Sequence, residues 1–532
     1  MGKELGIDFG TTTTEVSYID KKGRSRSMRL QGGRAVIPTV LYFNSEDDYI
    51  IGQSAAVKGA ENPEACVRNF KLDLTNSTKK YRVKAENGDK FSIKPIQAAQ
   101  FFLNQLIQIV QPKLLREFGE TGGTIDRAVI TVPAQFDPME KAAVKDAIEK
   151  AAKQAGFSQI KVAAEPTAAA VAYQEENGED GKTILVYDFG GGTFDVSVIR
   201  RKDDLYRELE TDGDKRLGGN RLTEKIAAVL WEKCLRETDK DYPFDAEEAE
   251  GYSAEDAEEY GLSRARFMLN RTEIFRAAED MKLDFTESEV SSQTVNFFTD
   301  DESDPRMMEL HMDEAEFYRI VKADVKKTVD LTRRVLEEMK RRGDADAVDE
   351  VVLAGGSSQI RLIQDLLKEY DDLRNLVTAS ADASTLIARG AALLASKELK
   401  TEEKTRFEIG TRIVKGKSLN AFEPLIPVGQ SLPCSGSRLY YPAREGQREI
   451  AIEYYEKDVK NYPDAKRIDD EGINLVDELT VSGLPDVPNL AVRVTFRIDA
   501  DGTPSIEAEV VDKEETVVGS GQLLINRKGN LY

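Results

Sequence analysis

Two short stretches of the chain share one pattern of apolar and polar positions. Each has an apolar run, then an Asp, then a turn rich in Gly or Thr: LGIDFGTTTT at 5–14 and ILVYDFGGGT at 184–193. Each is followed by a segment in which apolar and polar residues alternate, at 15–19 and at 195–199. The pattern predicts a strand, a tight turn and a second strand, twice. The sequence alone also allows two unrelated hairpins.

Helix and strand patterns alternate along the chain as far as residue 396. Apolar residues at helical spacing predict helices at 95–115, 141–155, 317–339 and 381–396. Short apolar runs predict strands at 35–43, 128–133 and 350–354. Strands and helices in alternation predict an α/β layered fold.

The pattern of apolar and polar residues changes after a short charged segment. We expect an α/β domain at 1–396, a charged linker at 397–406 and a β domain at 407–532. Within the last part, short alternating runs are separated by turns, which is typical of an antiparallel β domain.

The composition excludes several classes of function. The 532 residues carry a formal net charge of −22, which argues against nucleic-acid or anionic-membrane partners. No run of eighteen apolar residues and no signal-peptide core is present, so we expect a cytoplasmic protein. The single histidine, His311, and three widely spaced cysteines exclude His-based metal sites and triads. Asp, Glu, Lys, Thr and backbone amides are left to carry the chemistry.

The two predicted turns suit a nucleotide triphosphate. Bare backbone N–H groups and threonine hydroxyls are good partners for phosphate oxygens. Asp8 and Asp188, at the ends of the two strands, offer oxygen ligands to a hydrated Mg²⁺. Two such turns facing each other would hold a triphosphate from both sides. Lys71, by sequence alone, has the pattern of an exposed lysine.

Five segments, taken in order, resemble the signature motifs of the Hsp70 chaperone family, within the actin/hexokinase/Hsp70 superfold. They are 7–12 (IDFGTT), 130–134 (ITVPA), 165–170 (EPTAAA), 188–195 (DFGGGTFD) and 353–358 (LAGGSS). The C-terminal part, notably 425–433 and 494–502, resembles the family's peptide-binding β-sandwich. The resemblance covers nearly the whole chain. It implies a two-lobed actin-like ATPase of duplicated ribonuclease-H-like halves, followed by an antiparallel β-sandwich.

The resemblance also implies ATP hydrolysis with Mg²⁺, and a role for individual residues. Asp8 and Asp188 hold Mg²⁺ through its waters, and Lys71 neutralises the γ-phosphate and orients the attacking water. The residues implied as catalytic are Lys71, Glu165, Asp188, Thr193, Asp8 and Asp195. Those implied to contact ATP or ADP are Gly10, Thr11, Thr12, Thr13, Gly190, Gly191, Gly192, Gly218, Gly219, Glu279, Lys282, Thr286, Gly355, Gly356, Ser357 and Ser358. For Glu279 and Lys282 the sequence alone also allows an exposed helix pair.

The β domain is expected to bind extended or unfolded client peptides. Ile409, Tyr440 and Ile450 align with the family's apolar groove, although each also fits an ordinary β-domain core. The chain has no helical segment after the β domain that would match the family's lid, so we expect rapid peptide exchange. We also expect a monomer, with a nucleotide exchange factor as a further partner.

The sequence differs from the family at the residues that contact adenine and at those that relay a signal between the domains. Leu283 and Gln359 stand where the family stacks two arginines on adenine, so we expect weaker nucleotide affinity. Lys141 replaces an arginine that relays the signal between domains, and the linker is charged rather than leucine-rich. Ala164 replaces an asparagine used in J-protein docking, so we do not expect a J-protein partner.

We therefore expect an Hsp70-like chaperone, an ATPase whose β domain binds peptides. Two alternatives share the superfold: a metabolite or sugar kinase, and an actin-like ATPase that forms filaments. Neither alternative explains the C-terminal β domain.

Overall fold

The computed structural model describes most of the chain. The described residues are 3–76, 78–120, 125–155, 159–177, 181–244, 252, 254–342, 348–370, 373–374, 376–378, 383–397, 399–415, 418–442, 447–482, 484, 490–500, 502–511 and 517–524. The chain divides into two compact units. The first comprises residues 1–134, 147–203 and 209–398, and the second comprises 135–146, 204–208 and 399–532. The second unit thus takes in the predicted β domain and two short segments from earlier in the chain.

The first predicted hairpin lies at the centre of a sheet in the first unit, which we call the β1 sheet. β1 (Glu4–Phe9) and β2 (Thr13–Ile19) pair in antiparallel register, with Asp8 opposite Glu15. The strand order is β11-β10-β1-β2-β3, and β4 also pairs with β2. The other strands are β3 (Ser25–Ser27), β4 (Val36–Pro38), β10 (Arg127–Val132) and β11 (Gln159–Ala164).

The second predicted hairpin lies at the equivalent place of another sheet, the β12 sheet. β12 (Thr183–Phe189) and β13 (Phe194–Lys202) are antiparallel, with Asp188 opposite Asp195. The strand order β18-β17-β12-β13-β14 repeats the arrangement of the β1 sheet. The flanking strands are β14 (Leu205–Asp214), β17 (Glu350–Ala354) and β18 (Val377–Thr378). Both predicted hairpins are confirmed, and their equivalent positions explain why their sequences match.

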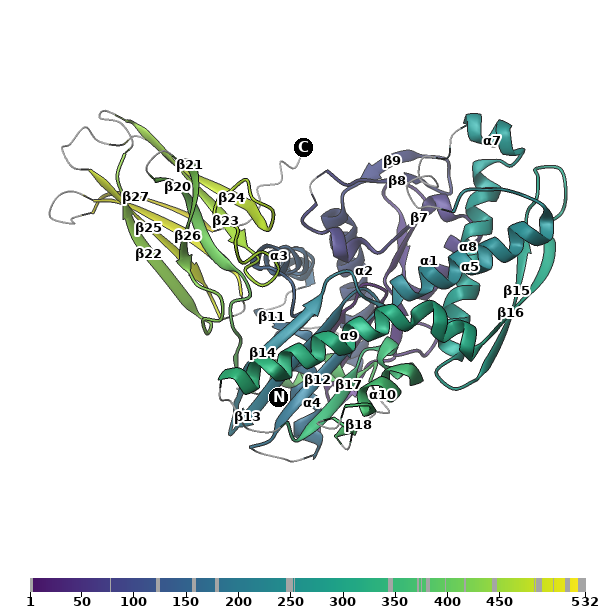
Figure 1. Cartoon of the computed structure of the whole chain (residues 1–532), viewed down its shortest axis with the longest axis horizontal. Helices are drawn as coiled ribbons and strands as arrows, with labels where there is room; N and C mark the ends of the chain where they lie inside the picture. The colour runs from purple at the N-terminus through teal and green to yellow at the C-terminus, as the bar shows by residue number, and fades with distance from the viewer. Residues whose placement is uncertain are drawn as a thin grey trace. The chain divides into compact units, whose positions relative to one another are not determined.

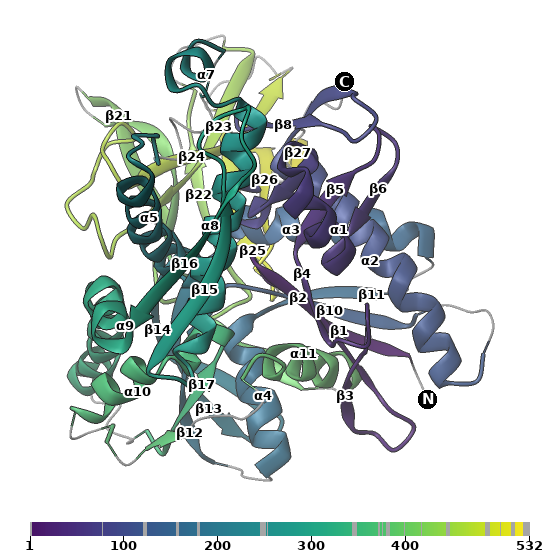
Figure 2. The same cartoon turned by 90° about the vertical axis from the view of Figure 1, so that its right-hand side faces the viewer.

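Two helices pack closely against each other and against the β1 sheet. α4 (Glu165–Asn177) follows β11, and α11 (Leu386–Ser396) covers β1 and β10 (Figure 2). A Cβ on Gly390 of α11 would lie 1.7 Å from the carbonyl oxygen of Ala168 in α4, so the two backbones are in contact. The small residues of both helices permit this approach.

The remaining helices of the first unit cover the sheets. The predicted helix at 95–115 is confirmed as α2 (Pro95–Glu117), with Pro95 in its first turn. The predicted helix at 317–339 lies within α9 (Glu314–Arg342), which packs against the β12 sheet (Figure 1). The others are α1 (Gly52–Glu61), α5 (Gly219–Thr238), α7 (Ala254–Tyr260), α8 (Arg264–Asp284) and α10 (Arg361–Lys368). None of the helices in the described ranges is long and apolar enough to cross a membrane.

Short strands and turns complete the first unit. They are β5 (Val40–Phe43), β6 (Tyr49–Ile51), β7 (Cys66–Arg68), β8 (Tyr81–Lys84), β9 (Lys90–Ile93), β15 (Val290–Phe297) and β16 (Arg306–Asp313), with the 3-10 helices η1 (Pro63–Ala65), η2 (Phe70–Asp73) and η3 (Gly356–Gln359).

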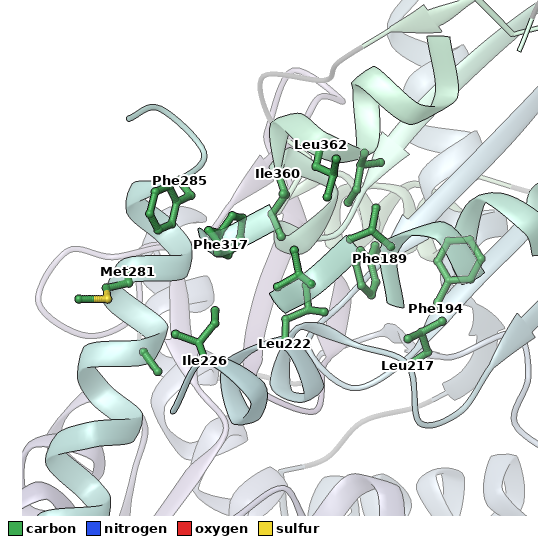
Figure 3. Close-up of a cluster of buried hydrophobic side chains, with 14 of the residues drawn as sticks. Phe189, Phe194, Leu217, Leu222, Ile226, Met281, Phe285, Phe317, Ile360 and Leu362 are labelled. Carbon is green, nitrogen blue, oxygen red and sulfur yellow. The ribbon is translucent and has the colours of Figure 1, made fainter. Parts of the chain in front are cut away.

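An apolar core lies beneath the second hairpin. Phe189 and Phe194, on either side of the hairpin turn, are fully buried. Side chains from α5, α8, α9 and α10 join them, among them Leu222, Met281 and Phe317 (Figure 3). This core fixes the turn between β12 and β13 relative to the helices that follow it.

The second unit contains two antiparallel sheets with one shared core. Their strand orders are β21-β20-β23-β24 and β22-β25-β26-β27. Buried residues from both sheets, such as Ile409, Tyr454 and Phe496, belong to one apolar cluster. The strands are β20 (Glu408–Lys415), β21 (Ser418–Ile426), β22 (Cys434–Tyr440), β23 (Glu449–Lys457), β24 (Ile473–Ser482), β25 (Ala491–Ile498), β26 (Pro504–Val511) and β27 (Val517–Leu524). The antiparallel pattern predicted for this part is confirmed.

The charged segment before β20 is paired within the second unit. β19 (Lys400–Glu402) forms a parallel ladder with the first residues of β14. The ammonium of Lys141, in α3 (Pro138–Ala155), donates a hydrogen bond to Glu403 at 2.9 Å, and both side chains are buried. Lys141 therefore has a buried acidic partner in the charged segment predicted as the linker.

Candidate functional site

The turns of the two hairpins touch each other. A Cβ on Gly191 would lie 2.0 Å from the hydroxyl of Thr12, and one on Gly192 would lie 2.5 Å from the hydroxyl of Thr11. Any side chain at these glycines would push the turns apart. A third turn joins them, because a Cβ on Gly218 would lie 2.5 Å from the carbonyl oxygen of Gly191. Thr11 and Thr12 of the first hairpin are thus brought together with Gly191 and Gly192 of the second.

Asn220 links these turns, and sequence reasoning missed it. Its backbone N–H donates to the carbonyl of Gly191 at 2.7 Å, and its side-chain oxygen accepts from the hydroxyl of Thr12 at 3.1 Å. Its side-chain amide donates to Asn69 at 3.1 Å. The only sequence signal for Asn220 is its place directly after the Gly218-Gly219 turn.

Lys71 lies buried beside the end of β1. It is 1% exposed, so its interpretation as an exposed lysine is wrong. Its ammonium donates to Glu165 at 2.8 Å and lies 5.6 Å from the ring centroid of Phe9. Asn69, two residues earlier, has a left-handed φ of 57° at the start of η2, which turns the chain into this position.

Two carboxylates reach Lys71 from different elements. Glu165 is the first residue of α4, where the helix N-terminus favours a negative charge. Asp8 ends the β1 ladder and accepts a hydrogen bond from the hydroxyl of Thr131 in β10 at 3.3 Å. The parallel pairing of β1 with β10 and of β10 with β11 therefore places these groups at one edge of the sheet.

The carboxylates of both hairpins lie in one electrostatic cluster that is short of positive charge. Burial raises the pKa of Asp8 to about 7, Glu165 adds to the shift, and Lys71 opposes it. Burial also raises the pKa of Asp188 well above its usual range, and the charges of Glu165, Asp195 and Asp8 add to that shift. A hard divalent cation with oxygen ligands would relieve this repulsion, so the donor set fits Mg²⁺.

These shifts predict that Mg²⁺ binding depends on pH. Metal ligation needs ionised carboxylates, so binding should displace protons from Asp8 and Asp188. Because the pKa of Asp8 is raised to about 7, Mg²⁺ affinity should be high above that pH and should fall as the pH drops through it. We expect the affinity for MgADP to fall by up to about tenfold per pH unit for each proton displaced, measured by calorimetry from pH 8 to 6. An affinity that is constant over this range would contradict the assignment.

Direct metal coordination is not evident. Among the described residues, no group of three or more His, Cys, Asp or Glu side chains is arranged to hold a metal ion. The assignment of Asp8 and Asp188 as ligands through water stays a prediction.

The predicted adenosine contacts converge on Gly219. Lys282 and Glu279, on α8, form an ion pair at 2.7 Å, and the ammonium of Lys282 also donates to Thr223 at 2.9 Å and to the carbonyl of Gly219 at 3.3 Å. A Cβ on Gly219 would lie 2.3 Å from the hydroxyl of Ser357. Lys282 is 5% exposed, so the exposed helix pair is the wrong interpretation for it. Sequence reasoning missed Thr223, which lies on α5 and has no motif to mark it.

The turn after β17 joins this group. Gly355 has a φ of 76°, and a Cβ there would lie 2.5 Å from the carbonyl oxygen of Phe189. The hydroxyl of Ser357 donates to the carbonyl of Gly190 at 3.2 Å, and that of Ser358 donates back to Gly355 at 2.7 Å. The glycine turn and the second hairpin are therefore in contact.

Some predicted residues lie outside the cluster. The hydroxyl of Thr286 donates to the carbonyl of Leu283 at 2.7 Å, next to the end of α8, and Thr13 is exposed at the start of β2. No hydrogen bond joins either side chain to the cluster in the described part of the chain.

The predicted groove residues of the β domain pack on the core of the second unit. Ile409 is 1% exposed and lies within that core, whereas Tyr440 and Ile450 are half-buried against it. The packing of Ile409 supports the ordinary-core alternative for that residue. The assignment of a peptide groove stays a prediction.

The chain matches a known protein family over most of its length. The model of the family described as Hsp70 protein matches residues 4–522, which includes the residues of both hairpins, Lys71, the Gly355 turn and nearly all of the second unit.

Proposed function

The chain belongs to the Hsp70 family, and from this membership we propose that it is an ATP-hydrolysing chaperone whose β domain binds extended peptide segments. Family members are ATPases that bind ATP or ADP with Mg²⁺ and act on client peptides. The proposal adds a fold for this activity: a two-lobed actin-like ATPase followed by a β-sandwich. It also adds cytoplasmic action, together with a nucleotide exchange factor as a partner.

One observation carries the proposal: Lys71 and Glu165 pair in a buried position beside Asp8, in electrostatic contact with Asp188 of the second hairpin. Phosphoryl transfer from ATP to water needs positioning and charge neutralisation rather than a covalent step. A bound Mg²⁺ would neutralise phosphate charge. Lys71 would place a further positive charge at the γ-phosphate, and Glu165 fixes the direction of its ammonium.

The chain's own turns would hold the phosphates. The hydroxyls of Thr11 and Thr12 and the backbone around Gly191 and Gly192 lie at the contact between the hairpins. Glycine is required there because a Cβ would meet the opposite turn. At the other end, Lys282 lies against the Gly219 turn, and by exchanging one of its three hydrogen bonds it would donate to an oxygen of a nucleoside.

Peptide-dependent ATP turnover tests the proposal. We expect the purified chain to hydrolyse ATP in the presence of Mg²⁺, and an unstructured peptide to change the rate. Hydrolysis that occurs only with a small hydroxylated acceptor, yielding a phosphorylated product, would support the sugar-kinase alternative instead. ATP-dependent polymerisation, measured by light scattering, would support the filament alternative.

The residues at the predicted adenine-binding positions lead to a prediction about ADP affinity. Leu283 is 53% exposed, and the side-chain amide of Gln359 donates to the hydroxyl of Ser358, so neither residue supplies a cation to an adenine ring. Replacing either by Arg should tighten ADP binding about two- to fivefold, since a cation over an aromatic face contributes ~0.5–1 kcal/mol. Calorimetry with ADP measures this, with Leu283→Met as the matched control. Unchanged affinity in both arginine variants would place the adenine elsewhere.

A further inference from the structure

Glu15 occupies the same place in the first hairpin that Asp195 occupies in the second. Each lies seven residues after the aspartate that ends the first strand, and each is the direct cross-strand partner of that aspartate. Directly opposed residues of an antiparallel pair point to the same face of the sheet. Both hairpins therefore present a pair of carboxylates, Asp8 with Glu15 and Asp188 with Asp195.

The surroundings of Glu15 do not fully offset the burial of its carboxylate. Its side chain lies in β2 and is 1% exposed. The hydroxyls of Ser27 and Ser17 lie beside it, but neither carboxylate oxygen has a donor in full hydrogen-bonding geometry among the described residues. A buried carboxylate that is incompletely hydrogen-bonded costs folding free energy. The charged side chains whose fields reach it are Asp8, at the strand end beside it, and Arg389 on α11.

The face on which Glu15 lies also carries Asp8, and α11 packs on it. Gly6, two residues before Asp8 on β1, lies against the backbone of α11, because a Cβ there would be 2.2 Å from the carbonyl oxygen of Ala388. α11 thus closes this face of the sheet beyond Asp8. A cation bound at Asp8 would add a positive charge beside the carboxylate pair of Asp8 and Glu15.

We propose that Glu15 is a further acidic residue of the nucleotide–metal site, which holds the hydrated metal at Asp8 from the first hairpin as Asp195 does beside Asp188 from the second. This role rests on the proposed function, since it concerns the metal that accompanies ATP or ADP. Glu15 is a positioning residue: it acts on the metal's water shell and on Asp8, and it touches neither phosphate nor the attacking water.

The test is the Mg²⁺ dependence of ADP binding, which does not require turnover. Calorimetric titrations of the full chain with ADP at increasing MgCl₂ give the half-saturating Mg²⁺ concentration. Glu15→Gln keeps the shape of the side chain and removes its charge. We expect it to raise the half-saturating Mg²⁺ concentration about tenfold or more, as loss of an outer-shell partner does, and to leave ADP binding without Mg²⁺ unchanged. Asp195→Asn should shift it in the same direction.

Three comparisons make the result decisive. Glu4→Gln, at the far end of β1, removes another buried carboxylate of the same sheet and should leave the Mg²⁺ dependence unaltered. Glu15→Asp retains the charge and should restore most of the Mg²⁺ affinity, and it serves also if Glu15→Gln fails to fold. Equal Mg²⁺ dependence in Glu15→Gln and the unaltered chain, with a shift in Asp195→Asn, would overturn the role of Glu15 alone. Absence of MgADP binding by the unaltered chain would overturn the proposed function and this role with it.

Discussion

Replacing Lys71 by Ala should lower ATP turnover by about 100-fold or more while nucleotide binding persists. The ammonium of Lys71 is buried and aligned by Glu165 at 2.8 Å, so its position is fixed before ATP binds. Preorganised charges of this kind act mainly on the transition state, and removal of one such donor costs about 100- to 1,000-fold in kcat. ADP affinity is expected to depend mainly on the turns and the adenosine end. Single-turnover hydrolysis and ADP calorimetry measure the two effects separately.

Two further variants isolate the role of the charge. Lys71→Met fills the same space without an ammonium and should lose as much turnover as Lys71→Ala, although Glu165 then remains buried without its cation. Lys84→Ala removes an exposed lysine that pairs with Glu64 and should leave turnover unaltered. Thermal melting should show that Lys71→Met retains the fold. Unchanged turnover in Lys71→Ala would refute the assigned role.

The two hairpins could be predicted because their signals are local. Alternating apolar residues, a terminal Asp and a Gly- or Thr-rich turn lie within fifteen residues of one another, so a short window of sequence contains the whole pattern. The β1 and β12 sheets confirm both copies. The antiparallel strands of the second unit are predictable for the same reason, since each carries its own alternation.

The burial of Lys71 could not be predicted from the residues near it in the sequence. Nothing near it in the sequence distinguishes it from a surface lysine, because its burial depends on Glu165, 94 residues later, and on the ring of Phe9. Only resemblance to a family pointed to its role. Asn220 and Thr223 were missed for the same physical reason: their partners come from other elements, and single polar residues next to a turn or on a helix are common.

The position of Glu15 could be predicted from the sequence, but its burial could not. Its position is visible in the sequence when the two hairpins are aligned, since Glu15-Val16-Ser17 matches Asp195-Val196-Ser197. Its burial, with no donor in full hydrogen-bonding geometry among the described residues, is a property of the folded sheet. The place of Ile409 could not be predicted, because an apolar residue in a strand fits a groove and a core equally well until its exposure is known.

Replacing Gly390 by Ala should destabilise the first unit by about 3 kcal/mol or more, because the added methyl group has no room. Its Cβ would lie 1.7 Å from the carbonyl oxygen of Ala168, whereas overpacking a core by a methylene ordinarily costs ~1–3 kcal/mol. The obstacle is backbone, so it cannot yield by rotation of a side chain. Denaturant unfolding of the full chain, followed by the intrinsic fluorescence of Trp231 in the first unit, measures the loss.

Gly356→Ala is the matched control for stability. Gly356 does not have a left-handed φ, and a Cβ there would meet nothing within 4 Å, so the same substitution should leave the unfolding midpoint within about 0.5 kcal/mol. A loss of equal size in both variants would show that the general cost of replacing glycine, and not the contact with α4, sets the effect.

The double variant Gly390→Ala with Ala168→Gly identifies the atom responsible. If the clash involved the side chain of Ala168, trimming it would restore stability; because the clash involves the carbonyl oxygen, the double variant should be no more stable than Gly390→Ala. α4 also begins with Glu165, so any separation of α4 from α11 should displace the partner of Lys71. Turnover in Gly390→Ala should therefore fall even at temperatures where the protein remains folded, and turnover that followed the folded fraction alone would show that α4 moves without disturbing the pair.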